Sequence, residues 1–277
     1  MKKIIIPIDF SEHSEYALKT AAKLAKKHDA ELLALHMLEM SDNILTTSDA
    51  LQNQKTMFFL QLAEKKFQDF LNKDYLEGVT VTPIIKHFKV FSEVNDVATE
   101  HNADLIVMGS HGASGLTEYF VGSNTERVVR NSNVPVLVVK TDLMDVNFNV
   151  IAFACDFQEA SVKSYLSAQE MFGQIASKLY LIHVNLPNES FKSSLEIEKK
   201  MVNFFTKAEG HLNKMEDVVY VSDYTVEDGV LNCANKIGAD LIVVPTHGRK
   251  GLAHFFQGSI SEDVANHATL PVLTFKI

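Results

Sequence analysis

The feature that most constrains this chain is an internal repeat. Six short blocks of its first half recur in its second half in the same order; Asp9-Phe10, for example, recurs as Asp156-Phe157. Matches kept in one order along a whole chain indicate a tandem duplication, so both halves should share one fold. The joint falls in the polar stretch 140–149, and we expect one domain over residues 1–142 and another over residues 147–277.

Within each half, short apolar runs alternate with helical patterns. The runs of the first half lie at residues 4–8, 32–37, 79–85, 105–108 and 134–139. They are mostly continuous and rich in β-branched residues, which is typical of parallel strands buried on both faces. Between them, apolar side chains recur at helical spacing, as at Ala17, Ala21 and Leu24. The sequence therefore predicts an α/β protein with two repeated domains, each a five-stranded parallel sheet covered by helices on both faces.

Composition excludes several classes of protein. Of 277 residues, 46% are hydrophobic and 22% charged, which is too apolar for a disordered chain. The formal net charge of −9 argues against nucleic acid as a partner. Two cysteines are too few for a secreted fold that is stabilised by several disulfide bonds. No apolar run approaches the ~20 residues of a membrane span. We expect a cytoplasmic protein with neither a nucleic-acid nor a membrane partner.

The strongest chemical signal is a glycine-rich segment after the fourth apolar run. Gly109, Gly112, Gly115 and Gly122 are four of twelve glycines, and the segment opens onto Ser123 at a predicted helix start. Glycines let backbone amides approach a ligand closely, and a helix N-terminus adds unpaired N–H groups. Together they predict an anion cradle at the carboxyl ends of the strands, where α/β sheets bind ligands. The segment lacks the lysine of a phosphate-binding P-loop.

Each candidate residue also has a structural interpretation. Ser123 with Glu126, and Ser259 with Glu262, fit helix capping boxes, and Asp9 and Asp156 fit helix starts as well. We expect His36 and His183 to be packed, hydrogen-bonded histidines rather than ligands, and Cys155 and Cys233 to belong to the core. His111 and His247 fit either a ligand contact or a role in fixing the loop.

The combination of these motifs resembles a known family. Gly109-x2-Gly112-x9-Gly122-Ser123, together with Pro7-Ile8-Asp9 at the end of the first run, resembles the nucleotide motif of universal stress proteins. The resemblance covers the whole chain as a tandem pair. It implies the adenine nucleotide alpha hydrolase-like fold, with strand order 3-2-1-4-5, and ATP held with Mg²⁺ or Mn²⁺ through its phosphates. No direct protein ligand of the metal is predicted.

The resemblance also implies a set of binding residues in the first half. Asp9 would contact the ribose or adenine, Met37 the adenine through its backbone, and Gly109 the phosphates. The complete set is Pro7, Ile8, Asp9, Met37, Met108, Gly109, His111, Gly112, Gly122, Ser123, Asn124 and Thr125.

The second half departs from this pattern at one position. It keeps a possible second site at Asp156, Gly248, Arg249, Gly258 and Ser259. Pro245, however, stands where the first half has Gly109, and proline has no N–H and a fixed φ. We therefore expect ATP to bind the first half tightly and the second weakly. The basic side chain of Arg249 keeps open the alternative that the second half binds a different anion. Gly109→Pro is expected to abolish binding and leave the fold intact.

Three functions remain open on the sequence alone. The first is an ATP-binding stress-response module that acts as a switch, with little or no hydrolysis, because no general base is recognisable beside the cradle. The others are a slow adenine-nucleotide hydrolase and a scaffold or carrier for a small molecule that is not a nucleotide. The last runs, 134–139 and 270–275, are apolar and would be edge strands, so we expect them to face each other in an intrachain pseudo-dimer. Further homodimerisation is compatible with this, and the sequence names no protein partner.

Overall fold

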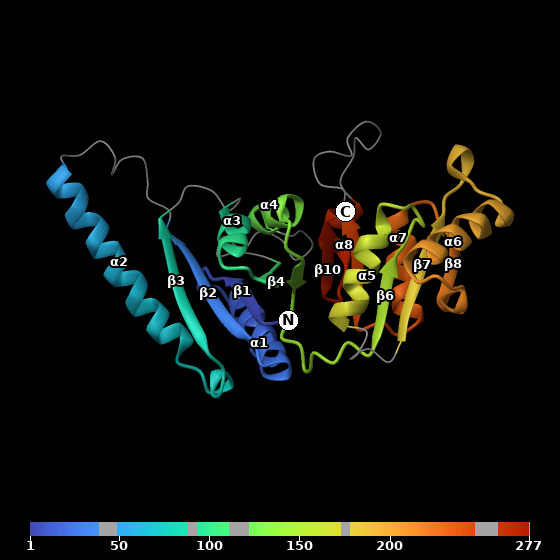
Figure 1. Cartoon of the computed structure of the whole chain (residues 1–277). Helices are drawn as coiled ribbons and strands as arrows, with labels where there is room; N and C mark the ends of the chain where they lie inside the picture. Colours follow the sequence, from blue (N-terminus) through green and yellow to red (C-terminus); the bar gives the residue numbers. More distant parts are fainter. Residues whose placement is uncertain (39–48, 88–92, 111–121, 173–177, 247–259, 277) are drawn as a thin grey trace. The chain divides into compact units, whose positions relative to one another are not determined.

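The computed structural model describes residues 1–38, 49–87, 93–110, 122–172, 178–246 and 260–276. The chain divides into two compact units, Met1–Val146 and Asn147–Ile277. The first unit thus includes residues 143–146, which the sequence analysis left between its two domains. Figure 1 shows the elements of both units.

The first unit is a parallel α/β unit. Its strands are β1 (Lys3–Pro7), β2 (Glu31–Leu38), β3 (Val81–His87), β4 (Leu105–Gly109) and β5 (Val136–Val139). Its helices are α1 (Glu12–His28), α2 (Asp49–Leu71), the 3₁₀ turn η2 (Asp74–Leu76), α3 (Glu93–Glu100) and α4 (Ser123–Asn131). The strands are parallel in the order β3-β2-β1-β4-β5. This confirms the predicted order 3-2-1-4-5.

The second unit repeats this topology. Its strands are β6 (Val150–Ala154), β7 (Lys178–Asn185), β8 (Val218–Ser222), β9 (Leu241–Thr246) and β10 (Val272–Lys276). Its helices are α5 (Ser161–Phe172), η3 (Asn188–Ser190), α6 (Ser194–Ala208), η4 (Asn213–Asp217), α7 (Val226–Lys236) and α8 (Ile260–His267). The order β10-β9-β6-β7-β8 is the same arrangement read from the other end, again all parallel.

Crossover handedness sets which helices cover which face. From β1 the chain moves one way through β2 to β3, and then the other way from β4 to β5. Because parallel crossovers are right-handed, α1 and α2 fall on one face and α3 and α4 on the other. The contacts agree, since α3 packs on α4 and α7 on α8, and Figure 1 draws α3 beside α4.

The hydrophobic periodicity identified the core helices correctly. Ala17, Ala21 and Leu24 of α1 are buried, and so are Val230 and Cys233, which lie one turn apart on α7. Helix α1 contacts β1, β4 and β5, so this stripe covers the middle of the first sheet. Burial of a Leu- or Val-sized side chain is worth about 1.5–3 kcal/mol, which makes these faces the main source of stability.

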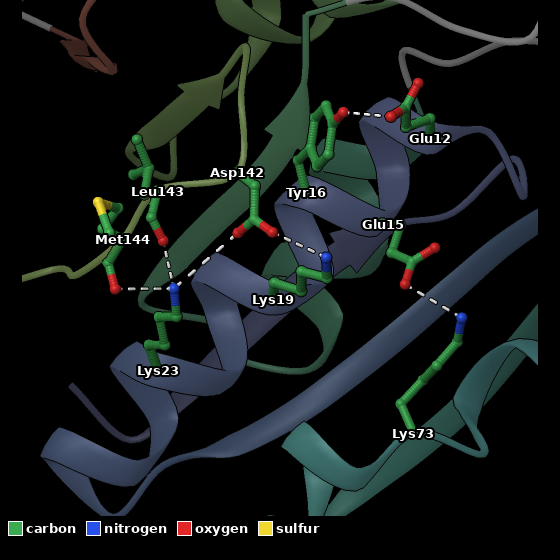
Figure 2. Close-up of polar contacts among 9 residues, drawn as sticks. All are labelled: Glu12, Glu15, Tyr16, Lys19, Lys23, Lys73, Asp142, Leu143 and Met144. Atoms are coloured by element: carbon green, nitrogen blue, oxygen red, sulfur yellow. Dashed lines mark hydrogen bonds and ion pairs between the residues drawn. The ribbon is translucent and has the colours of Figure 1, made fainter.

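The segment after β5 is attached to α1. Figure 2 shows Lys19 Nζ paired with Asp142 at 2.8 Å, and Lys23 Nζ donating to the carbonyls of Leu143 and Met144. These contacts hold residues 142–144 on the first unit, which explains why its boundary lies beyond the last strand.

Candidate functional site

The carboxyl ends of β1 and β4 form the topological switch point of the first unit. From β1 the neighbouring strands lead in opposite directions, and ligands of open α/β sheets bind in the crevice at such a point. Ile8 donates its amide to Leu35 O at 2.7 Å, on the β2 side. The amides of successive strand residues point to opposite neighbouring strands, so the backbone nitrogen of Pro7 points toward β4. Because proline has no N–H, it donates no hydrogen bond to β4. The β1–β4 pairing spans only Ile4–Ile5 and Leu105–Ile106, so the two strands lose their ladder before the edge.

Asp9 follows immediately and is fixed by its own turn. Its Oδ1 accepts hydrogen bonds from the Ser11 amide at 3.0 Å and the Ser11 hydroxyl at 2.5 Å. The helix start predicted at Asp9 is wrong, because the N-cap of α1 is Ser11, whose Oγ accepts from the Ser14 amide. The carboxylate is half-buried at the switch point instead of capping the helix.

A strained residue sets the direction of this turn. Phe10 has φ +65°, and its counterpart Phe157 has φ +55°. A bulky residue with positive φ is rare and is held only where its surroundings demand it. The Phe10 ring packs on His36 at 4.6 Å between centroids and on Phe67 at 5.5 Å, and Phe157 packs on His183 at 5.2 Å. The same turn, with the same aromatic support, therefore presents the aspartate in both units.

The two histidines are packed supports, as predicted. His36 Nδ1 lies 2.8 Å from Ile8 O, and His183 Nδ1 lies 2.9 Å from Cys155 O. Burial lowers the pKa of both rings, so each is neutral near pH 7 and donates Nδ1–H to the strand carbonyl. Met37, the predicted adenine contact, is buried next to His36 near the end of β2. Cys155 and Cys233 are buried, which confirms that both belong to the core.

Gly109 ends β4 against the first turn of α1. A Cβ at this position would lie 2.6 Å from the His13 carbonyl oxygen and 2.7 Å from its carbon, so only glycine fits here without a shift. The expectation that Gly109→Pro leaves the fold intact is therefore wrong, because the ring would collide with the α1 backbone. Met108, before it, is buried in the strand.

Helix α4 starts close to this strand end. The Gly122 amide donates to Ser110 O at 2.6 Å, and Thr125 Oγ1 donates to Gly109 O at 2.8 Å. The first helical residue, Ser123, is exposed, Asn124 is half-buried and Thr125 is buried. The N-cap is Gly122 and makes no side-chain cap bond, so the capping box predicted at Ser123–Glu126 is wrong.

Several predicted site residues lie outside the described part of the chain. These are His111, Gly112 and Gly115 in the first half, and His247, Gly248, Arg249, Gly258 and Ser259 in the second. The second capping box, at Ser259, lies there as well. The described part of the site therefore consists of the two strand ends, the Asp9 turn and the start of α4.

The second unit presents its aspartate in the same way but closes β9 differently. Asp156 Oδ1 accepts from the Gln158 amide at 2.9 Å and from Ser161 Oγ at 2.8 Å. Pro245 lies inside β9, in register with Phe275. Ile242 donates to Pro271 O on the β10 side, so Pro245 faces β6, where the pairing ends at Val243. Proline is tolerated here because no ladder bond is lost.

Among the described residues, no three or more His, Cys, Asp or Glu side chains are grouped so that they could hold a metal ion. No described helix combines the length and the apolar character needed to cross a membrane.

The fold and the strand-end geometry define a class of protein: a tandem of two adenine nucleotide alpha hydrolase-like α/β units. The model of the universal stress protein family matches residues 1–140 and again 147–276. The chain therefore belongs to the universal stress protein family, with two family domains.

Individual relatives agree with this assignment. A universal stress protein of Methanocaldococcus jannaschii is 34% identical over 153 residues, covering 50% of this chain and 94% of its own. A universal stress protein of Mycolicibacterium smegmatis is 23% identical and covers 99% of this chain and 96% of its own length. The crystal structure of a universal stress protein from Archaeoglobus fulgidus superimposes with a TM-score of 0.66 at 22% identity, covering 99% of this chain and 98% of its own. That structural likeness supports the tandem fold.

Proposed function

We propose that the first unit binds ATP at the carboxyl ends of β1 and β4 and that the protein acts as a nucleotide-dependent switch in the stress response. One observation carries the proposal: Gly109, at the end of β4, lies directly against the first turn of α1, which follows the Asp9 turn. The Asp9 turn and the end of β4 thus both adjoin the first turn of α1, where the β1–β4 ladder has stopped. The start of α4 is bonded to the same strand end.

Each part of this edge suits one part of the nucleotide. A carboxylate such as that of Asp9 accepts hydrogen bonds from ribose hydroxyls. The first-turn amides of α4 and its dipole favour phosphate oxygens without a basic side chain. Mg²⁺ or Mn²⁺ would enter with the nucleotide, since such ions are commonly held through substrate phosphates. The ion would neutralise phosphate charge, which matters in a chain with a net charge of −9.

We propose binding rather than rapid hydrolysis. Among the described residues of the edge, His36 directs Nδ1 to a strand carbonyl, and burial lowers the pKa of its ring. Asp9 Oδ1 already accepts two hydrogen bonds from Ser11. Neither arrangement resembles a general base poised beside a water molecule. Turnover should lie far below the enzyme median of ~10 s⁻¹.

We further propose one tight site per chain, in the first unit. Gly109 directs its amide toward β1, whereas Pro245 has no amide hydrogen at the matching position. A hydrogen bond to a charged group contributes ~1.5–3 kcal/mol, so the second site should bind about ten- to a hundredfold more weakly.

The assembly proposal follows from the topology of each unit. Val136–Val139 and Val272–Lys276 are the outer strands of their own units, and both are rich in apolar residues. A bare apolar edge promotes aggregation, so we propose that the two strands face each other as an intrachain pseudo-dimer. Cysteine pairs placed across the two strands should cross-link within one chain; monomeric, soluble separate halves would contradict this.

Calorimetry on the purified full chain tests the binding proposal. With ATP and Mg²⁺ we expect about one tight site per chain, and native mass spectrometry should detect co-purified adenine nucleotide. Phosphate release should stay far below ~10 s⁻¹. Absence of any nucleotide binding would favour a carrier for another small molecule, and release near that rate would identify a hydrolase.

A further inference from the structure

One buried hydroxyl joins the end of β4 to the first turn of α4. Thr125 Oγ1 donates to Gly109 O at 2.8 Å, and the residue is 3% exposed. One turn earlier along the chain, the Gly122 amide donates to Ser110 O at 2.6 Å. These two bonds fix the start of α4 to the last residues of the strand.

The position of Gly109 in the sheet explains why its carbonyl takes a side-chain donor. Ile106 and Ser110 donate to Pro135 O and Val139 O, both on the β5 side. Alternation along the strand therefore directs the N–H and C=O of Gly109 toward the β1 side. The β1–β4 pairing ends at Ile106, so this carbonyl lies beyond its last strand partner. Buried carbonyls are almost always hydrogen-bonded, and the Thr125 hydroxyl supplies the donor.

We propose that Thr125 is a positioning residue that aligns the first turn of α4 with the phosphates of the bound nucleotide, an inference that rests on the proposed function. The amides at the start of α4, including those of Ser123 and Asn124, lack helical acceptors and are the groups that would meet the phosphates. Asp9, in the turn after β1, would hold the ribose. The bond from Thr125 to Gly109 sets the spacing between these two parts of the site.

This role predicts a selective effect. Loss of the hydrogen bond from Thr125 to Gly109 leaves the nucleoside contacts at Asp9 in place. It lets the start of α4 adopt several positions, and only some of these bring its amides to the phosphates. The apparent dissociation constant rises in proportion as the competent fraction falls. ATP binding should therefore suffer, whereas adenosine binding should not, and a merely structural role would affect both ligands alike.

Variants of Thr125 in the full chain test this by calorimetry with ATP–Mg²⁺ and with adenosine. Thr125→Val has nearly the same shape without the donor and should raise the ATP dissociation constant roughly tenfold, with adenosine changed less than about twofold. Thr125→Ser restores the hydroxyl and should bind ATP like the wild type. Thr20→Val is the matched control, because Thr20 is 1% exposed and its hydroxyl has no hydrogen-bond partner among the described residues.

The outcomes separate the inference from the function beneath it. Wild-type ATP affinity in Thr125→Val, or equal losses for ATP and adenosine, would overturn the positioning role and leave ATP binding in place. A wild-type chain that binds neither ligand would overturn the proposed function and the inference with it. Should Thr125→Val fail to fold, Thr125→Cys replaces it, since the thiol is a weaker donor; wild-type ATP affinity there would also overturn the inference.

Discussion

Replacing Gly109 with alanine tests the junction on which the site depends. The added Cβ would lie 2.6 Å from His13 O and 2.8 Å from its Cβ, distances at which one of the two segments must move. Inserting a methyl group into a packed site typically costs ~1–3 kcal/mol. Because the close neighbours are backbone atoms of a capped helix, we expect the upper part of this range. Each kcal/mol lowers the melting temperature of a chain of this size by about 2–4 °C.

Hydrogen exchange followed by mass spectrometry suits this protein. The chain has no tryptophan to report unfolding by fluorescence. Its two units need not unfold together, so a single global unfolding curve would combine the stabilities of both. Gly109→Ala should speed exchange in α1 and β4 while leaving the second unit unchanged. ATP affinity should fall by at least about tenfold, since losing one hydrogen bond to a charged phosphate costs ~1.5–3 kcal/mol.

Gly78→Ala is the matched control. Gly78 has φ +78°, so alanine there is strained by about 1–2 kcal/mol, but nothing lies within 4 Å of the added Cβ. Both variants should therefore lose stability, Gly109→Ala somewhat more, but only Gly109→Ala should lose ATP affinity. Wild-type exchange in α1 together with wild-type ATP affinity in Gly109→Ala would refute the close contact between β4 and α1.

Three further predictions concern the same edge of each sheet. Asp9→Asn keeps the acceptor for Ser11 and should weaken ATP binding about ten- to a hundredfold in a titration, whereas Asp156→Asn should leave the tight site unchanged. Pro245→Gly restores an amide and should strengthen the second site by about the same factor; calorimetry showing no change would place the defect elsewhere in its loop. Burial lowers the folded pKa of His36 and His183, so the unfolded chain binds their protons first as pH falls. Stability should be full above pH ~6.5 and decline below it, and His36→Gln should flatten part of this decline in urea unfolding measured from pH 8 to pH 5.

The sheet and its helices could be predicted because their signals are regular. Continuous apolar runs and the stripe around Ala17 and Leu24 repeat along the chain, and the duplication supplied each signal twice. Strand order came from the resemblance, and the structure confirms it. The helix caps were mistaken because several neighbouring residues could serve: Ser11 rather than Asp9 caps α1, and Gly122 precedes Ser123 at α4.

The turn at Phe10 had no recognisable signal in the sequence. Left-handed backbone is usually marked by glycine or asparagine, and phenylalanine favours extended structure. Its conformation depends on the rings of His36 and Phe67, which lie far away in the sequence. The bond from Thr125 to Gly109 was equally hidden, since it joins residues sixteen positions apart. Tertiary packing, and not local propensity, determines both features.

Both units keep the strands at their switch point apart with a proline, but they place it on opposite strands. In the first unit Pro7, on β1, lacks the amide facing β4, and Gly109 supplies an amide from β4. In the second unit Ala154 stands at the β6 position, and Pro245 removes the amide from β9. Either placement ends the ladder and opens the edge, so the aspartate turn is preserved in both units. Only the first placement leaves an amide on the strand that continues toward the predicted phosphate loop. Divergence of the two halves at this pair of positions can therefore change ligand binding without disturbing the sheet.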